Sequence, residues 1–263
     1  MDNFNQSSLI NDSLKNILKT ATGILLLING LLFIVTILLN ISGIEIVDIG
    51  GLHFFLAKDF HFYQFVTYLF LHASVWHIIS NLLFLWFFGQ IVEKYWGAKR
   101  FIAYYMICGT VGGILQELAQ FVSFYLTVAG QEPATSFGTV LEAGKQLSND
   151  LNSWITIGSS IPVCAVVLAF GVMFSQKRIF SIKVKWIIIS YVLLEILSFV
   201  GSFENGGGVF AAQLGAMLCG FILMKYWKNN RVQLINDEKI IEWGMKLLLI
   251  VVAINIVYLT LNI

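Results

Sequence analysis

Three short polar patterns stand out in this apolar chain, and the first combines two histidines with an asparagine. In the segment LHASVWHIISN, His77 and Asn81 are four residues apart and share one face if the segment is helical, with His72 five residues upstream. Imidazole and amide groups supply hydrogen-bond donors, and an oxyanion is stabilised where such donors converge. A plainer interpretation also stands, in which the histidines lie near a membrane interface and only satisfy local hydrogen bonds.

Histidines also suggest a metal site, but the ligand set is incomplete. No carboxylate or third histidine stands at ligand spacing from His72 and His77, and the three cysteines lie far apart in apolar segments. A catalytic zinc site uses three protein ligands and a structural site four. The sequence therefore predicts neither metal nor cofactor, and Cys108, Cys164 and Cys219 are expected to be small core residues.

The second pattern, GSSIPVCAVVLAFG, places two serines where a loop turns into an apolar helix. Pro162 suits the first helical turn, where its missing N–H costs little. Ser159 or Ser160 would then lie near the N-cap, and side-chain capping is the plainer role for either. The free N–H groups of a helix start could also form an oxyanion pocket beside a nucleophilic serine.

The third pattern, AAQLGAMLCG, carries a single amide, Gln213, about one turn inside an apolar segment. Its neighbours are small, and Ala216 and Gly220 form a small-xxx-small pair that lets another helix pack closely. Polar groups are costly inside a membrane, so the three patterns are expected to meet in one shared polar cavity.

Composition identifies the elements that must position these residues. The chain has 263 residues, of which 58% are hydrophobic and 12% charged, and its mean hydropathy is +0.81. Apolar runs of about 18 residues or more can cross a bilayer as helices. The sequence therefore predicts an all-α polytopic membrane protein, without a cleavable leader. Its spans are expected at about 21–42, 75–92, 101–122, 160–175, 185–201, 209–227 and 245–262.

Basic residues predict the orientation of these spans, because Lys and Arg concentrate on the cytoplasmic side. With the N-terminus in the cytoplasm, 14 of the 16 Lys and Arg fall on that side, leaving only Lys58 and Lys145 outside. A bacterial plasma membrane is the expected location. The aromatic segment between the first two spans is expected to lie along the membrane surface, and residues 127–157 to form an extracytoplasmic loop.

With these patterns in order, the chain resembles the rhomboid family of intramembrane serine proteases over residues 15–228. His72-x4-His77-x3-Asn81 is similar to the family's second-helix motif, and GQIVEKYWGAKRF to its usual turn into the third helix. GSSI stands where the family carries Gly-x-Ser-Gly, and AQLGAMLCG where it carries Ala-His-x-x-Gly-x-x-x-Gly. The resemblance implies a six-helix core, to which this chain adds a C-terminal seventh transmembrane helix.

The resemblance also implies roles for the site residues. Ser160 stands in the nucleophile position, His77 and Asn81 match the oxyanion-stabilising side chains, and His72 matches the accompanying histidine. The family's base is a histidine that removes the serine proton, but this chain has Gln213 there, and an amide cannot accept that proton at physiological pH. Ile161 replaces the glycine after the nucleophile and is expected to crowd the site.

These departures favour a membrane protein that binds transmembrane segments of client proteins over an active enzyme. The alternative is an active intramembrane serine endopeptidase that uses Ser160 with an unusual base. A structural or transport role is disfavoured because Glu195 is expected to be the only acid deep in a span. The expected parts are a cytoplasmic segment 1–20, a membrane domain 21–228 and a linker with the extra helix, 229–263. The bilayer and the client are the expected partners; nucleic acid is not, and the oligomeric state stays open.

Overall fold

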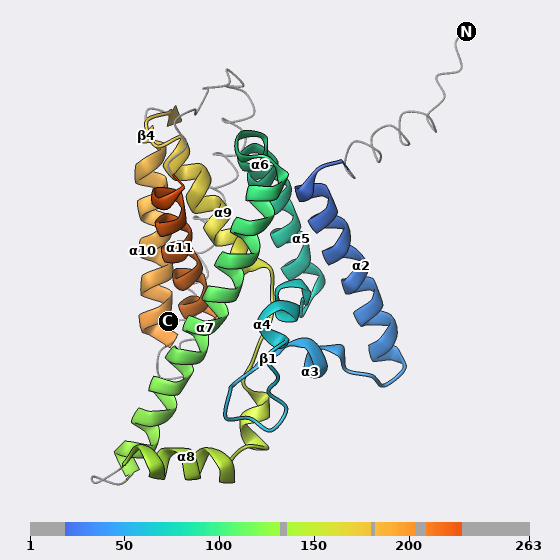
Figure 1. The fold of residues 1–263 in the computed structure, drawn as a ribbon, viewed down its shortest axis with the longest axis vertical. Coiled ribbons are helices and arrows are strands. Elements are labelled where there is room, and N and C mark those ends of the chain that lie inside the picture. Colours follow the sequence, from blue (N-terminus) through green and yellow to red (C-terminus); the bar gives the residue numbers. More distant parts are fainter. Residues whose placement is uncertain (1–18, 132–135, 180–181, 203–208, 228–263) are drawn as a thin grey trace.

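The computed structural model describes residues 19–131, 136–179, 182–202 and 209–227, and these form a bundle of helices (Figure 1). Within these residues, three helical stretches are long and apolar enough to cross a membrane: 21–41, 75–96 and 98–130. The main helices are α2 (Ala21–Ile41), α5 (Val75–Phe84), α6 (Gln90–Trp96), α7 (Ala98–Gln131), α9 (Ser160–Met173), α10 (Val184–Ser202) and α11 (Phe210–Tyr226). A π-helical turn, η2 (Leu85–Gly89), joins α5 to α6 in one continuous stretch.

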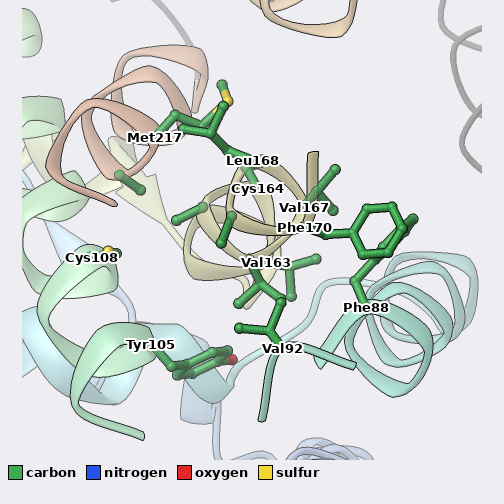
Figure 2. Close-up of a cluster of buried hydrophobic side chains, with 14 of the residues drawn as sticks. Phe88, Val92, Tyr105, Cys108, Val163, Cys164, Val167, Leu168, Phe170 and Met217 are labelled. Atoms are coloured by element: carbon green, nitrogen blue, oxygen red, sulfur yellow. The ribbon is translucent and has the colours of Figure 1, made fainter. Parts of the chain in front are cut away.

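Helix α9 is the centre of the bundle. Every residue from Ile161 to Gly171 is buried, as expected for a helix that is apolar all round. Side chains from α7, α11 and the η2–α6 stretch converge on it, and Figure 2 shows Tyr105, Phe88 and Met217 among them. The rings of Phe88 and Phe170 meet edge to face with centroids 5.0 Å apart. The site at the start of α9 is therefore held by a helix that cannot easily move.

Helices α7 and α11 pack so closely that a glycine is needed between them. A Cβ atom added to Gly112 would lie 2.6 Å from the carbonyl oxygen of Ala212 and 3.2 Å from the Cβ of Ala216. Gly220, one turn further along α11, is in similarly close contact with Tyr104. The predicted small-residue face of α11 is thus confirmed as a close helix–helix interface.

Helix α2 is joined to the bundle by a buried carboxylate. The two oxygens of Glu93, on α6, accept hydrogen bonds of 2.7 Å from the N–H groups of Ala21 and Thr22, and one also accepts from the Thr22 hydroxyl. These N–H groups belong to the first turn of α2 and have no partner within the helix. Negative charge is also favoured there by the helix dipole.

Shorter elements connect the long helices. They are α3 (Ile46–Gly50), α4 (Gln64–Thr67), η1 (Tyr68–Phe70), α8 (Phe137–Gln146) and η3 (Asp150–Ser153). Strands β1 (Leu52–His53) and β2 (Ile155–Thr156) pair antiparallel, and a second short pair, β3 (Arg178–Ile179) with β4 (Ile182–Lys183), joins α9 to α10. Buried Phe54, Phe124, Val140 and Leu151 form a small second apolar core, whereas Tyr68 and Leu69 of η1 belong to the main core.

Six of the predicted spans correspond to helices, and the differences lie at their ends. Helix α7 continues to Gln131, well past the predicted end near residue 122, so part of the expected loop 127–157 is helical. The remainder of that loop holds α8, η3 and β2 and packs against the segment after α2. The seventh span, at 245–262, lies outside the described residues. The placement of the segment after α2 along the membrane surface stays a prediction.

Replacing Glu93 by Gln tests the α2 attachment. The amide would turn an NH₂ group toward N–H donors, so we expect a loss of about 1.5–3 kcal/mol, the range for hydrogen bonds to a charged group. Thermal unfolding in detergent measures it as a lower Tm. Glu142→Gln, at an exposed position of α8, is the matched control and should leave Tm unchanged. Equal Tm values for the two variants would contradict this role of Glu93.

Candidate functional site

The start of α9 is positioned by the strand that leads into it. Strand β2 ends at Thr156, and the N–H of Gly158 then donates a 2.9 Å hydrogen bond to the carbonyl of Tyr68. Gly158 has a φ of +128°, a conformation that residues with a side chain rarely adopt. A Cβ atom at this position would lie 2.8 Å from Nε2 of His77 and 3.4 Å from Oγ of Ser160. Glycine therefore leaves room for the imidazole and the hydroxyl on this side of the backbone.

Ser159 and His72 form a buried pair that the sequence did not predict. The hydroxyl of Ser159 lies 3.0 Å from Nε2 of His72, and both side chains are almost completely buried. Ser159 occupies the N-cap position of α9 but makes no capping hydrogen bond with its side chain, so the capping role expected for it is wrong. The hydroxyl instead bonds an imidazole 87 residues away in sequence.

His72 lies just before the spanning helix. It stands between η1 and α5, which begins at Val75 after the capping residue Ser74, in agreement with the expected span of 75–92. Burial, reinforced by nearby His77, lowers the pKa of His72 to about 4, while the Phe70 carbonyl acts in the opposite direction. The His72 imidazole is therefore neutral at physiological pH, and its ring meets that of His77 edge to face at 5.0 Å.

His77 lies in the first turn of α5 with its two ring nitrogens in different surroundings. Its Nδ1 accepts a long, 3.4 Å hydrogen bond from the N–H of Ala73, while Nε2 points to the side of Gly158 where Ser160 lies. In a neutral imidazole the nitrogen that accepts has no proton, so the other carries it. This contact favours Nε2–H as a donor toward the Ser160 side of the site. A donor there could stabilise an oxyanion but could not remove a proton.

Several buried amide atoms in the described part of the bundle lack hydrogen-bond partners. They include Nδ2 of Asn81, one turn after His77 on α5, and Oε1 of Gln213, one turn inside α11. The Gln213 carbonyl therefore does not accept a hydrogen bond from Ser160. Buried polar atoms are nearly always paired with protein groups or water. Unpaired atoms of this kind indicate a polar site where water or a ligand could supply the missing hydrogen bonds.

Ile161 is packed into the core next to the start of α9. Its side chain is fully buried, and its Cγ2 would lie 2.5 Å from a Cβ added to Gly112, beside Ala212 and Ala216. The isoleucine thus fills the room that glycine leaves between α7 and α11. The Ile161 side chain therefore packs between α7 and α11, next to the site, where the absence of a side chain at Gly112 leaves room for it.

Three further polar residues join the site region without a clear signal in the sequence. Oε1 of Gln116, on α7, accepts a 3.2 Å hydrogen bond from the free N–H of Ala212 at the start of α11. The Tyr105 hydroxyl lies beside Ser159 and Asn29. Glu117 is buried on α7, where Oε2 accepts from the N–H of Phe55 at 2.7 Å. The expectation that Glu195 is the only acid deep in a span is therefore wrong, because Glu117 also lies within a membrane-length helix.

Comparison with known proteins identifies the class. The family model described as "Rhomboid domain" matches residues 59–230. The chain belongs to the rhomboid family, and it is an integral, multi-pass membrane protein. It is 26% identical to "Rhomboid-like protease 3" of Toxoplasma gondii over 187 residues, which cover 71% of this chain and 60% of that protein. It is 34% identical to "Rhomboid protease GlpG" of Salmonella newport over 58 residues, 22% of this chain and 21% of the relative.

Gly158→Ala tests the geometry at the start of α9. The unfavourable φ and the close approach to His77 should together cost about 2 kcal/mol or more, within the range for strained non-glycine conformations. Gly130→Ala on α7 is the control, because nothing lies within 4 Å of its added Cβ and a helical alanine is favoured over glycine. A lower Tm is expected only for the first variant. A harmless Gly158→Ala would show that the turn does not need glycine.

Proposed function

We propose that this rhomboid-family membrane protein binds transmembrane segments of client proteins with a protease site that lacks its base. The observation that carries the proposal is the identity of residue 213. It is a buried glutamine whose side-chain carbonyl oxygen has no partner, whereas the resemblance to the family predicts a histidine at this position. An amide can donate and accept hydrogen bonds but cannot take the proton of a serine hydroxyl. Loss of a triad residue in a serine protease removes several orders of magnitude in rate.

The remaining polar groups support binding of a peptide backbone. The assigned roles are Ser160 in the nucleophile position, His77 and Asn81 as donors toward a carbonyl oxygen, and His72 as their neighbour. The orphaned Nδ2 of Asn81 can donate to a carbonyl of an entering segment, and the orphaned Oε1 of Gln213 can accept from an N–H. An unwound part of a client helix would offer both groups, and pairing them removes the cost of leaving them unpaired.

The apolar surfaces of α5 and α10 support the choice of a transmembrane client. Both helices pack on α9 and leave large side chains exposed, among them Leu83 on α5 and Leu197 on α10. The Tyr191 hydroxyl of α10 lies 2.8 Å from Sγ of Cys164, and among the side chains described after Val192, those of Leu193, Ile196 and Leu197 are exposed. In a membrane, van der Waals packing stabilises the contact between such an apolar face and a client helix. Polar groups of the site would add specificity.

An active endopeptidase is the second candidate, and one observation favours it. His77 and Ser160 both flank Gly158, so an imidazole lies near the nucleophile position. For His77 to act as a base, Nε2 would have to give up the proton that the contact between Nδ1 and Ala73 assigns to it. A binder without a catalytic base is therefore the stronger candidate. We also propose that the N-terminus lies in the cytoplasm and that the membrane domain spans residues 21–228.

Reactivity toward a fluorophosphonate probe separates the two candidates. We expect the parent protein to stay unlabelled, because Ser160 has no base. Gln213→His should gain labelling, and Gln213→His combined with Ser160→Ala should lose it again. Ile161 is left in place in these variants because removing a fully buried isoleucine side chain from the core would cost about 2–5 kcal/mol.

Ser159→Ala in the Gln213→His background is the matched control for the reacting serine. Its hydroxyl is buried against His72, so labelling should persist without it. Labelling of the parent that disappears in both Ser160→Ala and His77→Ala would contradict the binder and establish the active enzyme with His77 as base.

Photocrosslinking tests client binding directly. A photoreactive amino acid at Leu83 or Leu197 should capture a transmembrane segment of a coexpressed single-span protein. Leu38 on α2 is the matched control, since its exposed fraction is 58% against 61% for Leu197. We expect crosslinks at the first two positions and none above background at the third. Equal crosslinking at all three positions would mean that the segment contacts the helices nonspecifically within the membrane, and it would overturn the proposed client site.

A further inference from the structure

A second feature of the bundle lies away from the candidate site, between α9, α10 and α11. It is a groove with a cavity volume of about 300 Å³. Its walls are almost entirely apolar and include Val172 on α9, Ile189 on α10 and Phe221 on α11. The volume is at the lower end of the range for small-molecule sites, roughly 300–1,000 Å³. Figure 1 shows these three helices side by side at the end of the bundle that carries β4.

Positive charge gathers where this groove reaches that end. Lys185, at the start of α10, lines the groove together with Ser175. Lys225, in the last turn of α11, has its ammonium nitrogen 4.6 Å from the ring centroid of Phe221, one of the groove residues. No Asp or Glu occurs between residues 151 and 194, so neither α9 nor the start of α10 offers a carboxylate to neutralise these lysines.

The β3–β4 hairpin adds further positive charge at this end of the bundle. Arg178 on β3 faces Lys183 on β4 across the strand pair, which places two cations opposite each other next to α10. Trp186 is exposed beside Lys185, whose Nζ lies 5.0 Å from the centroid of the indole ring. Tryptophan and lysine together are typical of the level of the lipid headgroups. The groove therefore runs from the headgroup level into the apolar part of the bundle.

We propose that this groove is a binding site for one anionic phospholipid. An acyl chain would fill the apolar groove, and the phosphate would lie between the ammonium groups of Lys185 and Lys225. Basic pockets between transmembrane helices are suited to anionic headgroups. A neutral apolar helix from a client or a second copy fits less well, because it would leave two ammonium groups beside an apolar surface without compensation.

The bound lipid would add contacts to α10. The first half of α10 is held by close packing of Ile188 against Gly171 and by Tyr191, whereas Leu193, Ile196 and Leu197 are exposed. An acyl chain lying against Val192 and Leu193 would brace the middle of α10. This lipid site stands independently of the client-binding proposal, because none of its residues belongs to the candidate active site.

Native mass spectrometry of the purified full-length chain tests the site, with dioleoyl phosphatidylglycerol and dioleoyl phosphatidylcholine as probes. We expect one phosphatidylglycerol to be retained in preference to phosphatidylcholine. Lys185→Gln and Lys225→Gln should each weaken its apparent affinity about fivefold, since a lysine near a membrane surface contributes about 1 kcal/mol toward anionic lipid. Lys99→Gln, at an exposed position near the start of α7, is the matched control and should have no effect.

A second variant tests the apolar half of the site. Val172→Trp should fill the groove and abolish retention of phosphatidylglycerol, and its Tm in phosphatidylcholine micelles verifies that it still folds. Inorganic phosphate alone should neither bind nor displace the lipid. Equal retention of the two lipids, retention unchanged in both lysine variants, or a dimer that Val172→Trp dissociates would each overturn the proposal.

Discussion

The structure depends on one constraint, the enclosure of α9. This helix is apolar on every side, so it can exist only where other helices cover it completely. Helix α7, α11 and the η2–α6 stretch provide that cover, and the glycine at position 112 lets α7 and α11 meet closely around Ile161. Because α9 is held this firmly, the residues at its first turn have a fixed place relative to α5 and α11.

The polar chemistry lies at the end of this enclosed helix, where the apolar cover stops. Some polar atoms there are satisfied within the protein, such as the Ser159 hydroxyl with His72 and the Gly158 N–H with the Tyr68 carbonyl. Others are buried and unpaired, above all in Asn81 and Gln213. An apolar bundle with a partly satisfied polar end is suited to a guest that carries its own hydrogen-bonding groups. A peptide segment has them, and a lipid chain does not.

The two inferred binding surfaces differ in what they demand of a guest. The site at the start of α9 offers uncharged donors and acceptors at the polar end of a buried helix. The groove beside α10 offers an apolar surface with ammonium groups at its mouth. Helix α10 is common to both, because Leu197 belongs to the proposed client surface and Ile189 lines the groove. A lipid bound in the groove would therefore restrict the movement of α10.

The sequence alone determined the membrane class, six helices and the order of the polar patterns, because apolar length and charge are properties of continuous segments. It also identified Gln213 as the unusual residue, since the chemistry of an amide does not depend on its surroundings. Only the tertiary structure decided which serine bonds His72, that Ile161 packs against Gly112, and that Glu93 caps α2. Those contacts join residues far apart in the chain, and no periodicity within one segment reports which distant group will lie beside it.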